Sequence, residues 1–233
     1  MIPFRDNIPS RTFPVITVLI ILANVFVFFY ELSLGRGLES FIYEYGVVPA
    51  AVFRWPASNL PLVAVALPFL TSMFLHGGWL HLIGNMWYLW IFGDNIEDRL
   101  GHFTYLLFYL LCGLGAGIVH TILNYDTVVP SVGASGAIAG VLGAYVVSYP
   151  GAKVLTLIPI FIFVQFIEIP ALIVLGLWFV MQFFNGAAAL ATTSASGGGV
   201  AWWAHVGGFI IGMILVVMFP RKDRPRYDYY SRR

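Results

Sequence analysis

Residues 133–148 read GASGAIAGVLGAYVVS and place a serine, Ser135, between two small residues at the head of a charge-free apolar stretch. Three glycines recur in this stretch at intervals of four and three residues, which puts them on one helix face: Gly136, Gly140 and Gly143. Small residues at such spacing let two helix backbones approach closely in lipid. The pattern predicts a closely packed transmembrane helix that is entered by a glycine-rich turn and ends before Pro150.

The composition extends this interpretation to the whole chain. Of 233 residues, 60% are apolar and only 10% carry a charge, whereas an average soluble domain has roughly 25% charged residues. Long charge-free stretches result, because the few charges are clustered; with His counted as neutral they include 15–30, 55–93, 102–125 and 169–220. Such stretches predict an integral membrane protein in contact with the lipid bilayer. The chain has neither a basic stripe nor a phosphate-binding loop, which argues against nucleic acid as a partner.

We expect an all-α polytopic membrane protein built as a six-helix bundle. The expected spans are 13–34, 79–96, 103–123, 133–149, 167–186 and 200–219. The apolar stretch 154–166 contains Pro159 and is too short for a span. The resulting domain division is a cytoplasmic segment 1–12, a membrane domain 13–219 and a cytoplasmic basic tail 220–233.

The orientation follows from the distribution of Lys and Arg. With six spans both termini share one side, and that side holds ten of the twelve basic residues, leaving only Arg36 and Arg54 on the other. The count predicts cytoplasmic termini, with the turn before Ser135 facing outside. The compact chain, in which no targeting segment is recognised, favours a prokaryotic plasma membrane.

Three groups of polar residues interrupt the apolar spans. His76 precedes the second span, and His81 and Asn85 lie four residues apart within it, on one helix face. The second group is the turn around Ser135, and the third is His205 in the last span. All three lie near the outer ends of their helices and are expected to converge on one site.

The residue types indicate nucleophilic catalysis. A serine needs a neighbouring base, usually an imidazole, to become a nucleophile. At a helix start, orphan backbone N–H groups favour a developing anion near Ser135, and His81 and Asn85 add side-chain donors. Glycines that continue the face of His205, such as Gly208 and Gly212, are expected to bring its ring within reach of the Ser135 hydroxyl.

Each feature also has a simpler explanation. A serine at a helix start is most often an N-cap, and glycine faces by themselves imply only packing. An intramembrane histidine can simply bond a neighbouring helix. His76 and His81 are possible metal ligands, but neither an H-E-x-x-H motif nor a nearby carboxylate or cysteine accompanies them. The joint occurrence favours catalysis without a metal or another cofactor.

Over residues 71–219 the sequence resembles the rhomboid family of intramembrane serine proteases. The resemblance is carried by three motifs in the family's order: Gly133-Ala134-Ser135-Gly136 for G-x-S-G, His205 with Gly208 and Gly212 for H-x-x-G-x-x-x-G, and His81 with Asn85 for H-x-x-x-N.

The resemblance implies a Ser–His dyad, with Ser135 as nucleophile and His205 as general base. It implies an oxyanion hole formed by His81, Asn85 and the Ser135 backbone N–H. His76 takes a weaker supporting role, as do Gly133, Gly136 and Gly208. One departure concerns the base: some rhomboids have an aromatic residue four positions after the serine, and this chain has Ala139. Trp202 or Trp203 is the expected substitute.

The expected substrates are the transmembrane helices of other membrane proteins, which must unwind to be cut. Residues 187–199 are rich in Gly, Ser, Thr and Ala and are expected to form a flexible loop. This loop and span five are expected to move, with Trp178 and Phe179 in a lateral gate. Three other functions remain open: a client-binding relative without activity, a small transporter or channel, and a metal-dependent protease.

Overall fold

The computed structural model describes residues 2–160, 163–191 and 201–219. Six long helices form the bundle: α1 (Val15–Ser33), α6 (Trp79–Leu100), α7 (His102–Leu123), α8 (Ser135–Ser148), α9 (Ala171–Ala191) and α10 (Trp202–Met218). The long loop after α1 forms four short helices: α2 (Leu38–Tyr45), α3 (Pro49–Arg54), α4 (Val63–Ala66) and α5 (Pro68–Thr71). Three 3₁₀ turns accompany them: η1 (Gly35–Gly37), η2 (Trp55–Ala57) and η3 (Ser72–Phe74).

The protein is a helical membrane protein, as predicted. Among the described residues, α1, α7 and α9 are long and apolar enough to cross a membrane, and a fourth span arises if the bent pair 63–74 and α6 is counted as one. Each predicted span falls on one long helix, but α8 and α10 have only 14 and 17 residues. Since a standard crossing takes about 20 residues, the count of six crossings stays a prediction.

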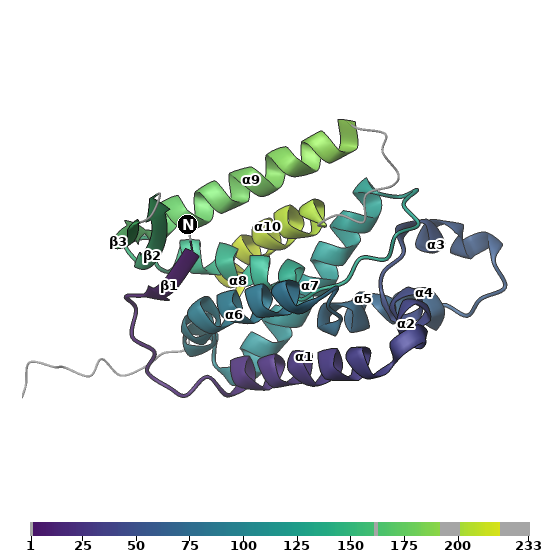
Figure 1. Ribbon diagram of the computed structural model, residues 1–233, viewed down its shortest axis with the longest axis horizontal. Coiled ribbons are helices and arrows are strands. Elements are labelled where there is room, and N and C mark those ends of the chain that lie inside the picture. Colours follow the sequence, from purple (N-terminus) through teal and green to yellow (C-terminus); the bar gives the residue numbers. More distant parts are fainter. Residues whose placement is uncertain (1, 161–162, 192–200, 220–233) are drawn as a thin grey trace, which may run out of the picture.

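Helix α8 is the most enclosed helix and packs on α10, α7 and α6, while α10 packs mainly on α8 and α7 and lies beneath α9 in Figure 1. Glycines on α8 and α10 make this contact close, because a Cβ at Gly208 or Gly212 would overlap the carbonyl oxygens of Gly136 and Gly140, respectively. The predicted close approach of these two helices is therefore observed. It fixes the start of α8 beside the start of α10.

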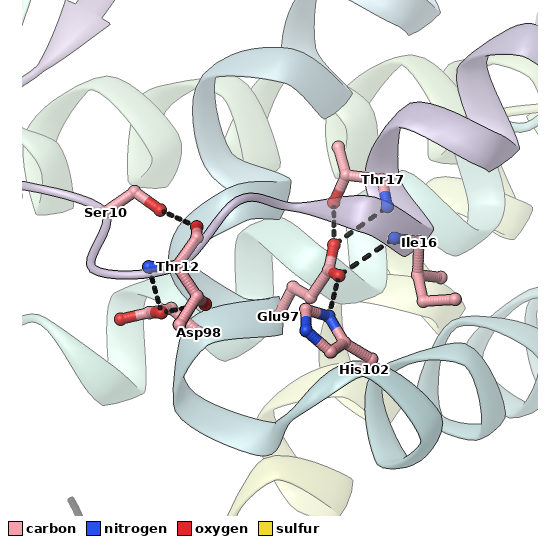
Figure 2. Close-up of polar contacts among 7 residues, drawn as sticks. All are labelled: Ser10, Thr12, Ile16, Thr17, Glu97, Asp98 and His102. Atoms are coloured by element: carbon pink, nitrogen blue, oxygen red, sulfur yellow. Dashed lines mark hydrogen bonds and ion pairs between the residues drawn. The ribbon is translucent and has the colours of Figure 1, made fainter.

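Helices α1 and α9 lie on opposite sides of the bundle (Figure 1). The first turn of α1 is tied to the end of α6 by Glu97, which is buried (Figure 2). Its carboxylate accepts hydrogen bonds from the backbone N–H groups of Ile16 and Thr17 at 2.9 and 2.8 Å and from the Thr17 hydroxyl at 2.7 Å. His102 Nδ1 lies 2.5 Å from the same carboxylate. The oxygens of this one side chain thus satisfy orphan donors at the helix start.

The sequence did not predict the three-stranded antiparallel sheet at one end of the bundle (Figure 1). It consists of β1 (Ile2–Asp6), β2 (Lys153–Ile160) and β3 (Phe163–Pro170), with β2 in the middle. The stretch 154–166 was not expected to be a span, and its described residues, 154–160 and 163–166, belong to strands β2 and β3. Residues 2–6 of the expected N-terminal segment belong to this sheet.

Two boundaries differ from the prediction. The fifth helix begins at Ala171 rather than at Ile167, because residues 163–170 pair with β2. It also runs to Ala191, so residues 187–191, expected in a flexible loop, are helical. The remainder of that expected loop, 192–199, and the tail 220–233 lie outside the described residues.

Candidate active site

Ser135 is the first residue of α8 and follows a turn that only glycine fits. Gly133 has φ +126°, a backbone conformation that other residues rarely adopt. A Cβ at this position would lie 2.7 Å from Cε1 and Nε2 of the His81 ring. The Gly133 N–H donates to the Ser72 carbonyl at 2.8 Å, which fixes the turn against the segment before α6. The turn that precedes Ser135 is thereby held beside the His81 ring.

The Ser135 hydroxyl lies beside the His205 imidazole, with Oγ 2.7 Å from Nε2. His205 is in the first turn of α10 and is 7% exposed. The two helices meet through Gly136 and Gly208, since a Cβ at either position would meet an atom of the neighbouring helices. The structure thus brings together the two residues that the sequence singled out as nucleophile and base.

The other ring nitrogen of His205 has a partner that the sequence did not predict. Nδ1 lies 2.7 Å from Oε1 of Gln182 on α9. The Trp178 ring, one turn earlier on α9, lies 5.7 Å from the imidazole at 35°. Of the two expected aromatic partners, Trp202 meets the imidazole edge-on at 6.3 Å, whereas Trp203 packs on Phe183. The sequence offered one indication of this partner, namely that Gln182 is a glutamine within an expected apolar span.

His81 and Asn85 lie on α6 and face the turn at Gly133. The Gly77 N–H donates to His81 Nδ1 at 3.4 Å, which leaves the proton on Nε2, the nitrogen nearest to Gly133. Asn85 is 8% exposed, and its Nδ2 is the next polar atom facing Gly133. Two side-chain donors therefore converge beside the turn that presents Ser135.

His76 supports these donors from behind. Its Nε2 lies 2.9 Å from Asn85 Nδ2, and its ring lies 5.1 Å from the His81 ring. The backbone N–H of His76 donates to both carboxylate oxygens of Glu31 at 3.2 Å. Glu31 is buried at the end of α1 and was not predicted to take part. It connects α1 to the histidine cluster.

A small cavity of about 30 Å³ adjoins Ser135. Its lining includes Ser72, Met73, His120 and Gly136. A cavity of this size has room for one or two water molecules. The site thus combines a hydroxyl, an imidazole and space for water.

Metal ligation was one alternative for the histidines. Within the ranges that the structure describes, there is no group of three or more His, Cys, Asp or Glu side chains placed to hold a metal ion. His102 instead lies against Glu97, and His120 lies against Asn124 with Nδ1 3.3 Å from its Nδ2.

Comparisons with known proteins agree with the geometry. The sequence profile of the Rhomboid domain matches residues 65–222. The mitochondrial presenilin-associated rhomboid-like protein of Bos taurus is 31% identical over 73% of this chain and 44% of its own length. The mitochondrial presenilin-associated rhomboid-like protein A of Danio rerio is 31% identical over 74% of this chain and 49% of its own length.

A plant relative matches over a shorter stretch. The chloroplastic rhomboid-like protein 11 of Arabidopsis thaliana is 43% identical over 31% of this chain and 25% of its own length. The chain spans a quarter to about half of the length of these three curated relatives. Since the domain profile covers more than half of the chain, the protein belongs to the rhomboid family.

Proposed function

We propose that the protein is an intramembrane serine protease that hydrolyses peptide bonds in or near the transmembrane helices of other membrane proteins. The observation that carries this proposal is the 2.7 Å contact between Ser135 Oγ and His205 Nε2. Family membership supports it, because the three motifs of the expected site all fall within the matched range.

In the first half of the reaction, His205 Nε2 accepts the Ser135 proton while Oγ attacks the carbonyl carbon. The resulting oxyanion is stabilised by His81 Nε2–H, the Asn85 amide and the N–H of Ser135. Collapse of the intermediate breaks the C–N bond, and the leaving amine takes the proton from His205. An acyl group then remains on Ser135 Oγ.

Water completes the cycle. His205 takes a proton from a water molecule, the hydroxide attacks the acyl carbon, and Ser135 regains its proton as the carboxylic acid leaves. The cavity beside Ser135 offers space for this water. The substrate helix must unwind locally, because a helical carbonyl is shielded and already hydrogen-bonded.

The proposal includes the six-crossing topology of residues 13–219, with cytoplasmic termini and the active site opening to the outside. Location in a prokaryotic plasma membrane is also part of the proposal. The three relatives differ in this respect, since their names place those proteins in mitochondria or chloroplasts. The basic residues concentrated on the side of the termini support the orientation.

The direct test is cleavage of a single-span model substrate by the purified protein in detergent, with and without a chelator. We expect the wild type to cut equally in both conditions and Ser135→Ala and His205→Ala to be silent. Asn85→Ala should reduce kcat about 100-fold, the usual effect of removing one oxyanion donor. Undiminished cleavage by Ser135→Ala would refute the mechanism. A chelator-sensitive wild type would favour the metal-dependent alternative, and failure on several substrates the client-binding one.

A further inference from the structure

Gln182 is a buried polar side chain on the inward face of α9, which also includes the buried residues Val174 and Leu175. It is 7% exposed, whereas its neighbours Met181, Phe183 and Phe184 are 54%, 44% and 67% exposed. An amide in an apolar environment is costly unless it is hydrogen-bonded. Its oxygen lies 2.7 Å from His205 Nδ1, so its place in the bundle is explained by the imidazole.

This contact decides which nitrogen of the neutral imidazole carries the proton. An amide oxygen only accepts, so Nδ1 must be the donor and Nε2 is left with its lone pair toward Ser135 Oγ. The opposite tautomer would direct an N–H at the serine hydroxyl and could not accept its proton. A buried acceptor on Nδ1 is therefore the condition for His205 to act as a base.

We propose that Gln182 is a positioning residue for His205, fixing the tautomer and the ring orientation in which Nε2 faces Ser135. The inference rests on the proposed function and extends it from a pair to three residues, with a neutral amide where serine proteases with a triad use a carboxylate.

A second contact from the same helix acts in the same direction. The Trp178 ring lies 5.7 Å from the imidazole, one helical turn from Gln182, and Ala139 on α8 supplies no ring of its own. Further along α9, a Cβ at Gly186 would lie 3.1 Å from the Trp203 indole of α10. Residues of α9 contact the His205 ring, while α8 and α10 carry Ser135 and His205 themselves. Catalysis therefore requires α9 to be packed against α10.

Kinetics with matched variants tests the assignment. Gln182→Met keeps the volume and removes the strong acceptor, so we expect kcat to fall about 10- to 100-fold with little change in KM, a smaller loss than the roughly 10⁴-fold seen when the triad tautomer is wrong. Gln182→Glu keeps an acceptor oxygen and should retain kcat within about fivefold of wild type. Met181→Leu, on the outward face of α9, serves as the control and should be unchanged.

Spectroscopy provides a readout that does not depend on proteolysis. Protein labelled with ¹⁵N-histidine should show His205, assigned by comparison with His205→Ala, with its proton on Nδ1. In Gln182→Met the signal should move toward the Nε2–H form, while thermal unfolding shows that the variant is folded.

The outcomes separate the two proposals. An Nε2–H tautomer in the wild type, or unchanged kcat and tautomer in Gln182→Met, would overturn the role of Gln182. A folded Gln182→Glu as slow as Gln182→Met would also overturn it. If the wild type shows the Nδ1–H tautomer but cuts no substrate, the protease proposal fails while the positioning of His205 by Gln182 stands.

Discussion

The Nε2 atom of His205 lies 2.7 Å from the Oγ atom of Ser135, although 70 positions separate the two residues along the chain. Neither side chain reaches far to make this contact. The backbones of α8 and α10 are brought together by glycines at the crossing, and both residues lie in the first turn of their helices. Helix packing, rather than a flexible loop, therefore determines the geometry of the dyad.

Replacing Gly133 by alanine should abolish activity while leaving most of the fold intact. The new methyl group would lie 2.7 Å from the His81 ring and would demand a strained positive φ, so both the ring and the turn before Ser135 must shift. We expect a fall in kcat of at least about 100-fold, by analogy with the loss of one oxyanion donor. The control is Gly84→Ala, where a Cβ meets nothing within 4 Å. Normal cleavage by Gly133→Ala would contradict this description of the turn.

Gly212→Ala tests the helix crossing about two turns along α10 from His205. Its Cβ would overlap the carbonyl oxygen of Gly140, so the helices must separate, at a cost of about 1–3 kcal/mol typical of overpacking. We expect a lower melting temperature and slower cleavage together. Gly176→Ala on α9, where a Cβ meets nothing, is the control. If Gly212→Ala melts and cuts like the wild type, the crossing is looser than described.

Glu97→Gln should destabilise the protein without altering the dyad. The carboxylate accepts three hydrogen bonds from the first turn of α1 and faces His102 (Figure 2). An amide has only one acceptor oxygen, so we expect a loss of about 2–4 kcal/mol in unfolding free energy. Asp98→Asn, at a partly exposed carboxylate in the same turn, keeps the one oxygen that accepts from Thr12 and should cost much less. Equal melting temperatures for the two variants would argue against the role of Glu97.

Asp6 in β1 should make stability depend on pH. Burial raises the pKa of its carboxyl, although the hydroxyl of Tyr145 donates to it at 2.5 Å and the Asn95 amide at 2.9 Å. The folded state therefore holds this proton more tightly than the unfolded state, so stability falls as pH rises from the unfolded-state pKa through the folded-state pKa.

Asp6→Asn removes this titration and keeps an acceptor for both donors. Melting temperatures measured from acidic to neutral pH should decline less steeply with rising pH than those of the wild type. An unchanged or steeper decline would show that Asp6 is not responsible.

The placement of much of the candidate site could be predicted, because its residues lie in short sequence motifs. The spacing of Gly136, Gly140 and Gly143 predicted the close helix face, and His81 with Asn85 at four-residue spacing predicted a shared side. The positions of the long helices followed from hydropathy in the same way. Such features are local in sequence, so no knowledge of tertiary contacts was needed.

The features that were missed depend on partners distant in sequence. Gln182 is one polar residue in an apolar run, and nothing in the sequence reveals that it faces His205, 23 positions away. Strands β2 and β3 were missed because an apolar run without alternation carries no clear strand signal. The third strand of the sheet, β1, lies near the N-terminus, far from β2 in the sequence. Trp178 was noted for another role, since its contact with the imidazole arises only when α9 packs on α10.

The central claim is that Ser135 is a nucleophile activated by His205, and a fluorophosphonate reagent tests it without any knowledge of the substrate. The measurement is the mass and position of the covalent adduct after digestion of the labelled protein. We predict one adduct, on Ser135, that forms readily in the wild type and is lost in His205→Ala, while the folded state of that variant is verified by its melting curve. An adduct on another serine, or equal labelling of Ser135 without His205, would contradict the account.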